Sequence, residues 1–301
     1  YKYAIGEAIK HPLGFDMKLK EPLDFYAVTD HGFYMGMIEN YADTSSKMSK
    51  NEWTKPMHNL NRPENVTVES LGARADLFSS VLTQAIIKPY PYWHPKVWKA
   101  WLTNNIQVAL QSFDYDVHKS AWADVANAAE EFNDPGKFTT FIGYEFTTST
   151  DVEGGNLHRN VIFNSSDAPI RPWTRIDSIN PEDLWTWMDG LRDQGVDSLA
   201  MPHNSNGSNG QMFEVETFRG SPISKEYSEK RMRNEPVVEI TQIKGTSDTH
   251  PLLSPDDEWA DFEIMDKRVG SRPPTYSMPQ GGYVRDAFLR GLTLEWKGQG
   301  N

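Results

Sequence analysis

Short apolar runs alternate with amphipathic segments along most of the chain. The apolar runs have no proline in their interior and are bounded by polar or turn-forming residues, which is typical of buried strands. Their hydrophobicity is continuous rather than alternating, and this favours strands that are covered on both faces, as in a parallel sheet with helices outside. The predicted strands are Leu23–Thr29, Phe138–Phe146, Leu157–Phe163, Ser198–Pro202 and Val237–Ile243.

Segments with apolar residues at helical spacing lie between these strands. One of them follows Ser120 and another follows Asn180, and both are residue types that cap helix N-termini. The alternation of strand and helix predicts an α/β architecture, either a barrel or an open sheet. The predicted helices are Glu69–Ile87, Trp98–Phe113, Ala121–Phe132, Pro181–Gln194 and Tyr283–Gly291.

Long irregular segments interrupt this pattern, chiefly at residues 36–66, 204–221 and 250–277, with a shorter one at 147–156. Loops of this length inside a compact domain are usually functional, and in a barrel the loops after the strands build the active site. The stretch NSNGSNGQ, residues 204–211, could form a phosphate cradle or a flexible loop at the mouth of a site, and its residues leave both interpretations open.

Charge and composition narrow the classes of function. The net charge is −12, and the longest basic segment is Lys225–Arg233, so a nucleic-acid-binding surface is not expected. The chain has no cysteine, which excludes disulfides, a thiol nucleophile and thiolate metal sites. No stretch approaches the ~20 apolar residues of a membrane span. The compartment, periplasmic or cytosolic, and the oligomeric state stay open.

Acids and imidazoles recur where the predicted strands begin or end. A carboxylate between Tyr144 and Phe146 is costly to bury unless it is paired or bound to a metal. Two ligands separated by one residue can face the same side of an extended segment, as in D-T-H at 248–250. The residues at these positions are Asp30, His31, Glu145, His158, His203, Asp248 and His250.

Imidazole and carboxylate donors without thiolates are the ligand set of Zn, Mn or Fe, and favour a hydrolytic metal site. Each position alone also fits an ordinary structural role, because Asp30 suits a turn and a single His near a strand end is often hydrogen-bonded within the fold. The metal hypothesis therefore depends on the positions being brought together.

Five motifs, in order along the chain, resemble the PHP (polymerase and histidinol phosphatase) superfamily: DFYAVTDH, FIGYEFT, NLHRNVIF, MPHNSN and EITQIKGTSDTHP. They are most similar to a PHP-like branch described only as a domain of unknown function. The resemblance implies one domain over residues 1–301, a distorted (β/α)7 TIM-like barrel with long loops at its C-terminal face. It also implies two or three divalent ions and hydrolysis of a small phosphate ester by a metal-bridging hydroxide.

The resemblance assigns roles residue by residue. His31 would be a metal ligand and Asp30 a ligand or its supporting partner. Glu145 would bridge two metals, and His158 and His203 would each supply one imidazole. The superfamily's H-x-H motif is absent upstream of Thr29, and Asp248 and His250 have the D-x-H form without being established as the final D-x-H strand. We therefore expect a fragment that lacks both terminal strands and that could be inactive alone, the alternative being a complete chain with a degenerate site.

Three functions follow from these residues. The first is a metal-dependent phosphoesterase with Glu145, Asp30 and Arg159 in catalysis, where Arg159 either binds phosphate or forms a surface salt bridge. The second is amidohydrolase-like hydrolysis of a non-phosphate bond on the same barrel. The third is a non-catalytic module that binds a ligand or carbohydrate through some of the 10 Trp and 12 Tyr residues.

Overall fold

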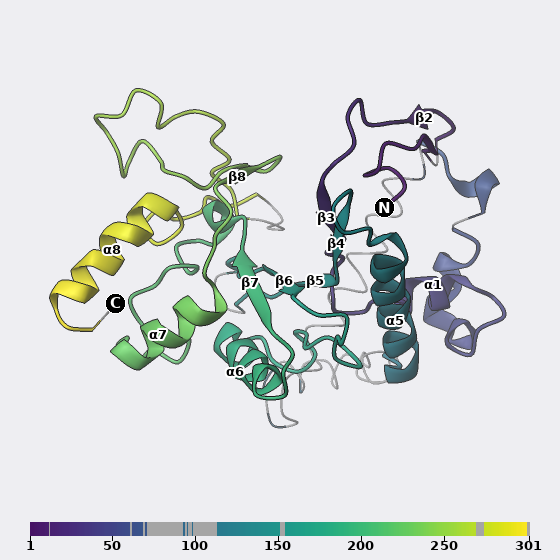
Figure 1. Ribbon diagram of the computed structural model, residues 1–301, viewed down its shortest axis with the longest axis horizontal. Coiled ribbons are helices and arrows are strands. Elements are labelled where there is room, and N and C mark those ends of the chain that lie inside the picture. The colour runs from purple at the N-terminus through teal and green to yellow at the C-terminus, as the bar shows by residue number, and fades with distance from the viewer. Residues whose placement is uncertain are drawn as a thin grey trace. The chain divides into compact units, whose positions relative to one another are not determined.

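A computed structural model of the chain describes residues 1–11, 13–60, 62–68, 113–150, 154–268 and 274–299, together with residues 70, 93, 95 and 98. Figure 1 shows the chain with most of its helices and strands labelled. The described strands are β1 (Ile9–Lys10), β2 (Asp16–Met17), β3 (Phe25–Ala27), β4 (Thr139–Phe141), β5 (Gly143–Phe146), β6 (Arg159–Phe163), β7 (Ser198–Pro202), β8 (Thr241–Gln242) and β9 (Gly245–Thr246). The described helices are α1 (Met37–Ala42), α5 (Tyr115–Phe132), α6 (Pro181–Arg192), α7 (Lys225–Asn234) and α8 (Val284–Trp296), with 3-10 turns η1 (Met48–Lys50), η2 (Glu52–Met57), η3 (Pro63–Asn65) and η4 (Ser205–Gly207).

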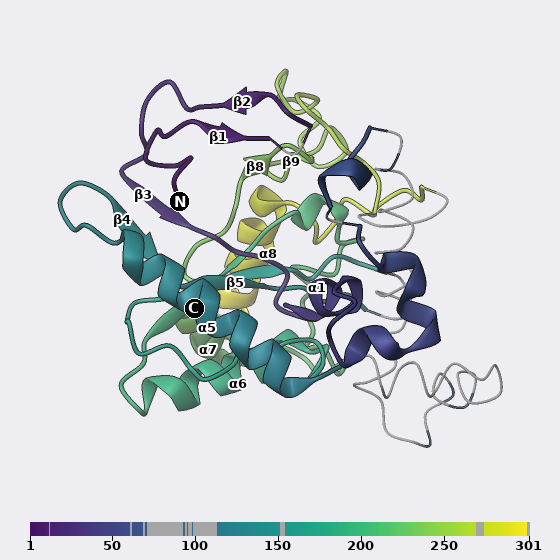
Figure 2. The ribbon, with the colours of Figure 1, turned by 90° about the vertical axis from the view of Figure 1, so that its right-hand side faces the viewer.

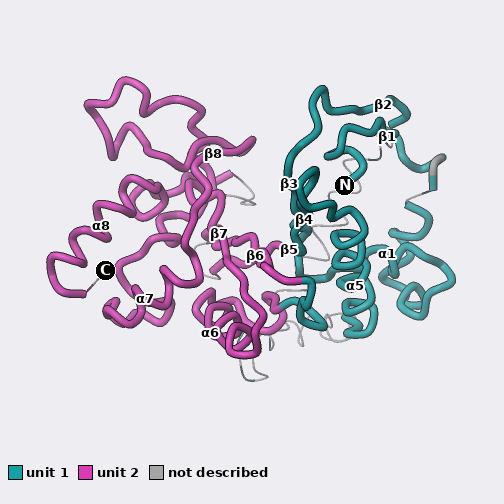
Figure 3. The backbone as a smooth tube through the Cα atoms, in the orientation of Figure 1, with its two compact units in different colours: residues 1–143, 166–172 teal, residues 144–165, 173–301 magenta. Residues whose placement is uncertain are grey.

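The chain forms two compact units, which Figure 3 shows in different colours. Unit 1 comprises residues 1–143 and 166–172, and unit 2 comprises residues 144–165 and 173–301. Each unit has its own sheets and its own buried apolar residues.

Unit 1 contains two small sheets and the long helix α5. β1 and β2 pair antiparallel, as Figure 2 shows, and β3 pairs with β4 in parallel. Helix α5 begins six residues before the predicted start at Ala121, because the Asp114 side chain accepts hydrogen bonds from the backbone N–H groups of Asp116 and Val117. The inner face of α5 buries Trp122 and His118, and the His118 Nε2 atom lies 2.8 Å from the Gly32 carbonyl.

Unit 2 is built on the sheet β5-β6-β7, except that Gly143 of β5 belongs to unit 1. Strand β7 has the predicted bounds. The predicted Asn180 cap of α6 is confirmed, since its side chain accepts from the Glu182 N–H and Pro181 follows at the first turn. Helix α8 extends past the predicted end at Gly291 to Trp296. Helices α1 and α7 were not predicted, and the two predicted helices over 69–87 and 98–113 lie almost entirely outside the described residues.

The predicted (β/α)7 barrel is wrong. The described residues form four separate sheets of two or three strands, and these do not close into a barrel. β6 and β7 pair antiparallel, and in both strands fully buried positions alternate with half-buried ones, so the strands are not covered equally on both faces. The predicted strand Val237–Ile243 is reduced to the two residues of β8, and Ile243 is 99% exposed. β8 pairs antiparallel with the two-residue strand β9, and an apolar composition does not by itself specify a longer partner strand.

Two close backbone approaches hold the 204–211 loop against the segment that precedes α8. Gly210 and Gly281 both have positive φ, 78° in each case. A Cβ on Gly281 would lie 2.3 Å from the Gly210 carbonyl oxygen, and a Cβ on Gly210 would lie 2.4 Å from that of Gln280. Both positions therefore require glycine, and the loop is tied to the body of unit 2.

An ion-pair network joins α6 to α7 and predicts a pH-dependent stability. Asp189 of α6 lies 2.7 Å from Arg233 Nη2 and accepts from Asn234 Nδ2 at 3.0 Å. Partial burial would raise the pKa of Asp189, but hydrogen bonds from Arg233 and Asn234 and the charges of Arg233 and Arg192 outweigh it, so the pKa lies below the ordinary 3.8. The network therefore stabilises the fold above that ordinary pKa, and this contribution is lost as the pH falls through the lower pKa of the folded state.

We expect Asp189→Asn to lower the free energy of unfolding at neutral pH. The difference in this free energy between the variant and the wild type should become smaller as the pH falls below 3.8, the ordinary pKa of an aspartate. Urea unfolding over a pH series measures both effects. The exposed Asp256→Asn is the control for loss of one carboxylate. A difference between Asp189→Asn and the wild type that is the same in acid and at neutral pH would contradict the assignment.

Candidate metal centre

Three predicted ligands meet in unit 2 at the ends of neighbouring strands. Glu145 lies on β5, His158 immediately precedes β6, and His203 immediately follows β7. The antiparallel register pairs Arg159 with Pro202, so the residues just outside this pair, His158 and His203, come to the same end of the two strands. Their ring centroids are 5.9 Å apart.

The Glu145 carboxylate lies between the two imidazoles. Its Oε1 atom is 2.8 Å from His158 Nδ1, and its Oε2 atom is 3.5 Å from His203 Nε2. One ligand atom from each of the three side chains lies within 4.8 Å of the other two. Among the described residues, Glu145, His158 and His203 form the one group of three His, Asp or Glu side chains whose ligand atoms lie this close together.

Neighbouring polar groups hold these side chains in place. The Thr147 hydroxyl donates to Glu145 Oε1 at 2.7 Å. The Asn156 side chain accepts from the His158 backbone N–H at 2.8 Å and donates to the Asn204 carbonyl at 3.4 Å. Asn156 thus connects the segment of one histidine to the residue after the other, which limits the freedom of both.

The donor set of one carboxylate and two imidazoles fits one divalent ion. The side chains of Glu145, His158 and His203 are only 12%, 15% and 6% exposed, so the charge of the carboxylate is held away from bulk water. Two ligands about 2.1 Å from a tetrahedral ion lie about 3.4 Å apart. The 3.5 Å between Glu145 Oε2 and His203 Nε2 matches this spacing, whereas the 2.8 Å between Glu145 Oε1 and His158 Nδ1 is a hydrogen-bond distance. The buried His203 Nδ1 atom has no hydrogen-bond partner among the described residues.

Among the described residues, the three-residue group does not include the other predicted ligands. Asp30 and His31 are exposed residues of unit 1. In unit 2, Asp248 Oδ2 is 3.4 Å from Arg285 Nε. His250 Nδ1 accepts from the Leu252 backbone N–H at 3.1 Å, and burial lowers the His250 pKa below its ordinary value against the opposing charge of Asp266. The part of unit 2 that the structure describes brings neither Asp248 nor His250 into the three-residue group, and their role as ligands stays a prediction.

Arg159 is neither exposed nor part of the group around Glu145. Its side chain is 3% exposed, and its Nε atom donates to Glu235 Oε1 at 2.6 Å. Arg159 also donates to the Leu157 carbonyl. The salt bridge that the sequence left open therefore exists, but it is buried and not on the surface.

Sequence reasoning missed several of the supporting residues. Thr147 is one of them, and its position two residues after Glu145 on an extended segment was the available signal. Lys244, whose Nζ donates to Asn204 Oδ1 at 3.1 Å, carried no signal in the sequence, because only the folded chain brings residue 244 beside the residue that follows His203.

The chain belongs to a protein family of unknown function. The family model described as "Protein of unknown function (DUF3604)" matches residues 1–301. No curated protein and no solved structure matches the chain. None of the described helices is both long and apolar enough to cross a membrane.

Proposed function

We propose that this chain is a metal-dependent hydrolase, with a phosphate ester as its substrate. The observation that carries the proposal is the approach of Glu145, His158 and His203 to one another from three strands, with the carboxylate between the two imidazoles. The resemblance of the surrounding motifs to the PHP superfamily supports the same chemistry. The argument does not depend on a barrel, because the three residues are assembled by the β5-β6-β7 sheet alone.

Each residue has a defined part in this proposal. His158 and His203 supply neutral imidazole nitrogens, and Glu145 supplies a carboxylate oxygen, so the site would hold a Zn, Mn or Fe ion. The Thr147 hydroxyl orients the carboxylate through its bond to Oε1. A divalent ion in such a site activates water for nucleophilic attack and offsets negative charge on a phosphate.

Lys244 supports a phosphate ester over an uncharged substrate. Lys244 is an exposed residue, yet a hydrogen bond from its Nζ to the Asn204 side chain holds its ammonium group beside the residue that follows His203. Arg159, the basic residue first expected to recognise phosphate, is instead committed to Glu235. A fixed lysine can bind a phosphate oxygen as a point charge, so Lys244 is proposed for this role.

The test measures hydrolysis by protein that has been stripped with a chelator and then supplied with Zn, Mn or Fe. The substrates are p-nitrophenyl phosphate, bis-p-nitrophenyl phosphate and p-nitrophenyl acetate. We expect metal-dependent release of p-nitrophenol from a phosphate ester, a loss of at least about 100-fold in His203→Ala, and little change in the control His11→Ala.

Two outcomes would contradict the proposal. Hydrolysis that is unaffected by both the chelator and His203→Ala would remove the metal centre from the reaction. Metal-dependent hydrolysis of the acetate with no action on either phosphate would retain a hydrolase but exclude the phosphate ester. If the acetate is the substrate, Lys244→Ala would also leave the rate of acetate hydrolysis unchanged.

A further inference from the structure

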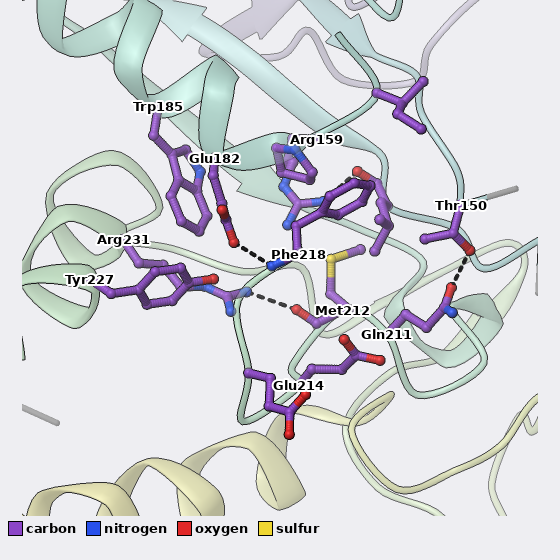
Figure 4. A pocket seen from close by; sticks show the side chains of 14 residues that line it. Thr150, Arg159, Glu182, Trp185, Gln211, Met212, Glu214, Phe218, Tyr227 and Arg231 are labelled. Atoms are coloured by element: carbon purple, nitrogen blue, oxygen red, sulfur yellow. Dashed lines mark hydrogen bonds between the residues drawn. The ribbon is translucent and has the colours of Figure 1, made fainter. Parts of the chain in front are cut away.

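A cavity in unit 2 is lined by charged groups of both signs. Its volume is about 350 Å³, and Figure 4 shows the side chains around it. Leu157 and Arg159 contribute to its wall, whereas the intervening His158 does not and instead contacts Glu145. The cavity is therefore separate from the candidate metal centre, although the same short segment contributes to both.

Two arginines line one side of the cavity. Arg159 and Arg231 share a single buried carboxylate, that of Glu235, with N–O distances of 2.6 and 3.2 Å. Arg231 is further fixed by a hydrogen bond from Nη2 to the Met212 carbonyl, and its guanidinium lies 5.6 Å from the Trp185 ring centroid. Arg159 and Arg231 present planar donors of the kind that recognise carboxylates. The Glu182 carboxylate also lines the cavity, and it accepts a hydrogen bond from the Phe218 backbone N–H.

The side toward α8 carries negative charge. Glu214 and Glu216 line the cavity there, and Figure 4 places Glu214 near that helix. Burial raises the pKa of Glu214, the neighbouring Glu216 raises it further, and Arg290 of α8 only partly opposes them. The two carboxylates repel each other, so an ammonium group placed between them would be stabilised.

Apolar and aromatic groups fill the space between the two charged sides. Trp185, Phe218 and Met212 line the cavity with the ring of Tyr227. Burial raises the pKa of Tyr227 to about 12, so its phenol stays neutral and can donate a hydrogen bond. A ligand that suits this wall has an apolar or aromatic body.

We propose that this cavity binds an amino acid or short peptide as a zwitterion, with its carboxylate toward Arg159 and Arg231 and its ammonium toward Glu214 and Glu216. The apolar wall between them accommodates an apolar or aromatic side chain of the ligand. This site is independent of the proposed metal centre, since none of Glu145, His158 and His203 lines the cavity.

Calorimetric titration of the full chain tests the proposal with glycyl-phenylalanine, its N-acetyl derivative and its C-terminal amide. The first has both charges, the second lacks the ammonium and the third lacks the carboxylate. We expect the unmodified peptide to bind about tenfold or more tightly than either derivative, because each lost charge removes a charge-assisted hydrogen bond. Phosphoethanolamine and glucose serve as a zwitterion and a neutral ligand that both lack the aromatic group.

The variant Glu214→Gln/Glu216→Gln assigns the ammonium end without disturbing the buried arginines. The variant should bind the unmodified peptide about tenfold more weakly than the wild type does. Its affinity for the N-acetyl derivative should be unchanged, because that derivative has no ammonium group to interact with the two carboxylates. Glu258→Gln, at an exposed position of the 250–277 segment, is the matched control and should alter neither.

The proposal is overturned if no peptide binds at millimolar concentration, or if the peptide and its two derivatives bind equally. It is also overturned if phosphoethanolamine or glucose binds as tightly as the peptide, since the aromatic wall would then contribute nothing to recognition. Hydrolase activity has no part in this measurement, so failure here leaves the proposed metal centre untouched.

Discussion

Replacing His203 with alanine is expected to abolish stoichiometric binding of a divalent ion while leaving the chain folded. The imidazole is one of three donors in the candidate centre, and its Nε2 atom lies 3.5 Å from the Glu145 carboxylate. Loss of a residue that merely supports a ligand costs about 10- to 100-fold in metal affinity, so loss of a ligand should cost at least that much. The measurement is the metal content of dialysed protein, with titration of Zn or Mn into the stripped protein.

Glu145→Gln gives an independent test because it keeps the shape of the side chain and removes its charge. It should weaken binding about as strongly as His203→Ala, since an amide is a poorer ligand for these ions than a carboxylate. Thr147→Val should have a smaller effect, about tenfold, because it removes only the hydrogen bond to Oε1.

His250→Ala decides whether the centre extends beyond the three residues. The His250 Nδ1 atom accepts a hydrogen bond from the Leu252 N–H, so we expect ion affinity to be unchanged in this variant. If affinity falls as far as in His203→Ala, His250 is a ligand as well. Unchanged binding in both His203→Ala and Glu145→Gln would instead exclude the proposed centre.

Removing the carboxylate of Glu235 should destabilise the chain by about 3–5 kcal/mol, because it leaves two guanidinium groups without their shared counter-charge. The Glu235 side chain is 2% exposed and accepts from Arg159, from Arg231 and, at 2.8 Å, from Trp185 Nε1. Burial would raise the pKa of Glu235, but the two arginines outweigh it and hold the pKa below its ordinary value, so the carboxylate is ionised at neutral pH. Chemical denaturation of Glu235→Ala against the wild type measures the loss.

Glu229→Ala in α7, the helix that ends just before Glu235, is the control. Its carboxylate is 48% exposed and lies 3.8 Å from Lys225, so its loss should cost no more than about 1 kcal/mol. A triple replacement, Arg159→Met with Arg231→Met and Glu235→Leu, should recover part of the stability lost in Glu235→Ala, because no unpaired charge is then buried. Equal, small effects of Glu235→Ala and Glu229→Ala would show that the ion pair does not stabilise the fold.

Local patterns in the sequence found those elements whose signals are short-range. The β7 segment and the Asn180 cap of α6 were predicted correctly, because strand-like side chains and a capping residue act over a few neighbouring positions. The predicted start of α5 was wrong, since both Ser120 and Asp114 are capping types and only Asp114 accepts the first N–H groups. The barrel was wrong for a different reason. Apolar runs report burial, but they do not report whether the strand beside them is parallel or antiparallel.

The sequence by itself determined which side chains are available for metal chemistry: imidazoles and carboxylates without a single cysteine. It also placed Glu145, His158 and His203 at the ends of apolar runs. Only the tertiary structure decided that these three approach one another, because the antiparallel register of β6 and β7 brings residues 45 positions apart to one end of the sheet. The structure likewise paired Arg159 with Glu235 rather than with the candidate metal centre. Pairing between distant residues depends on the packing of the whole unit, and no local pattern specifies it.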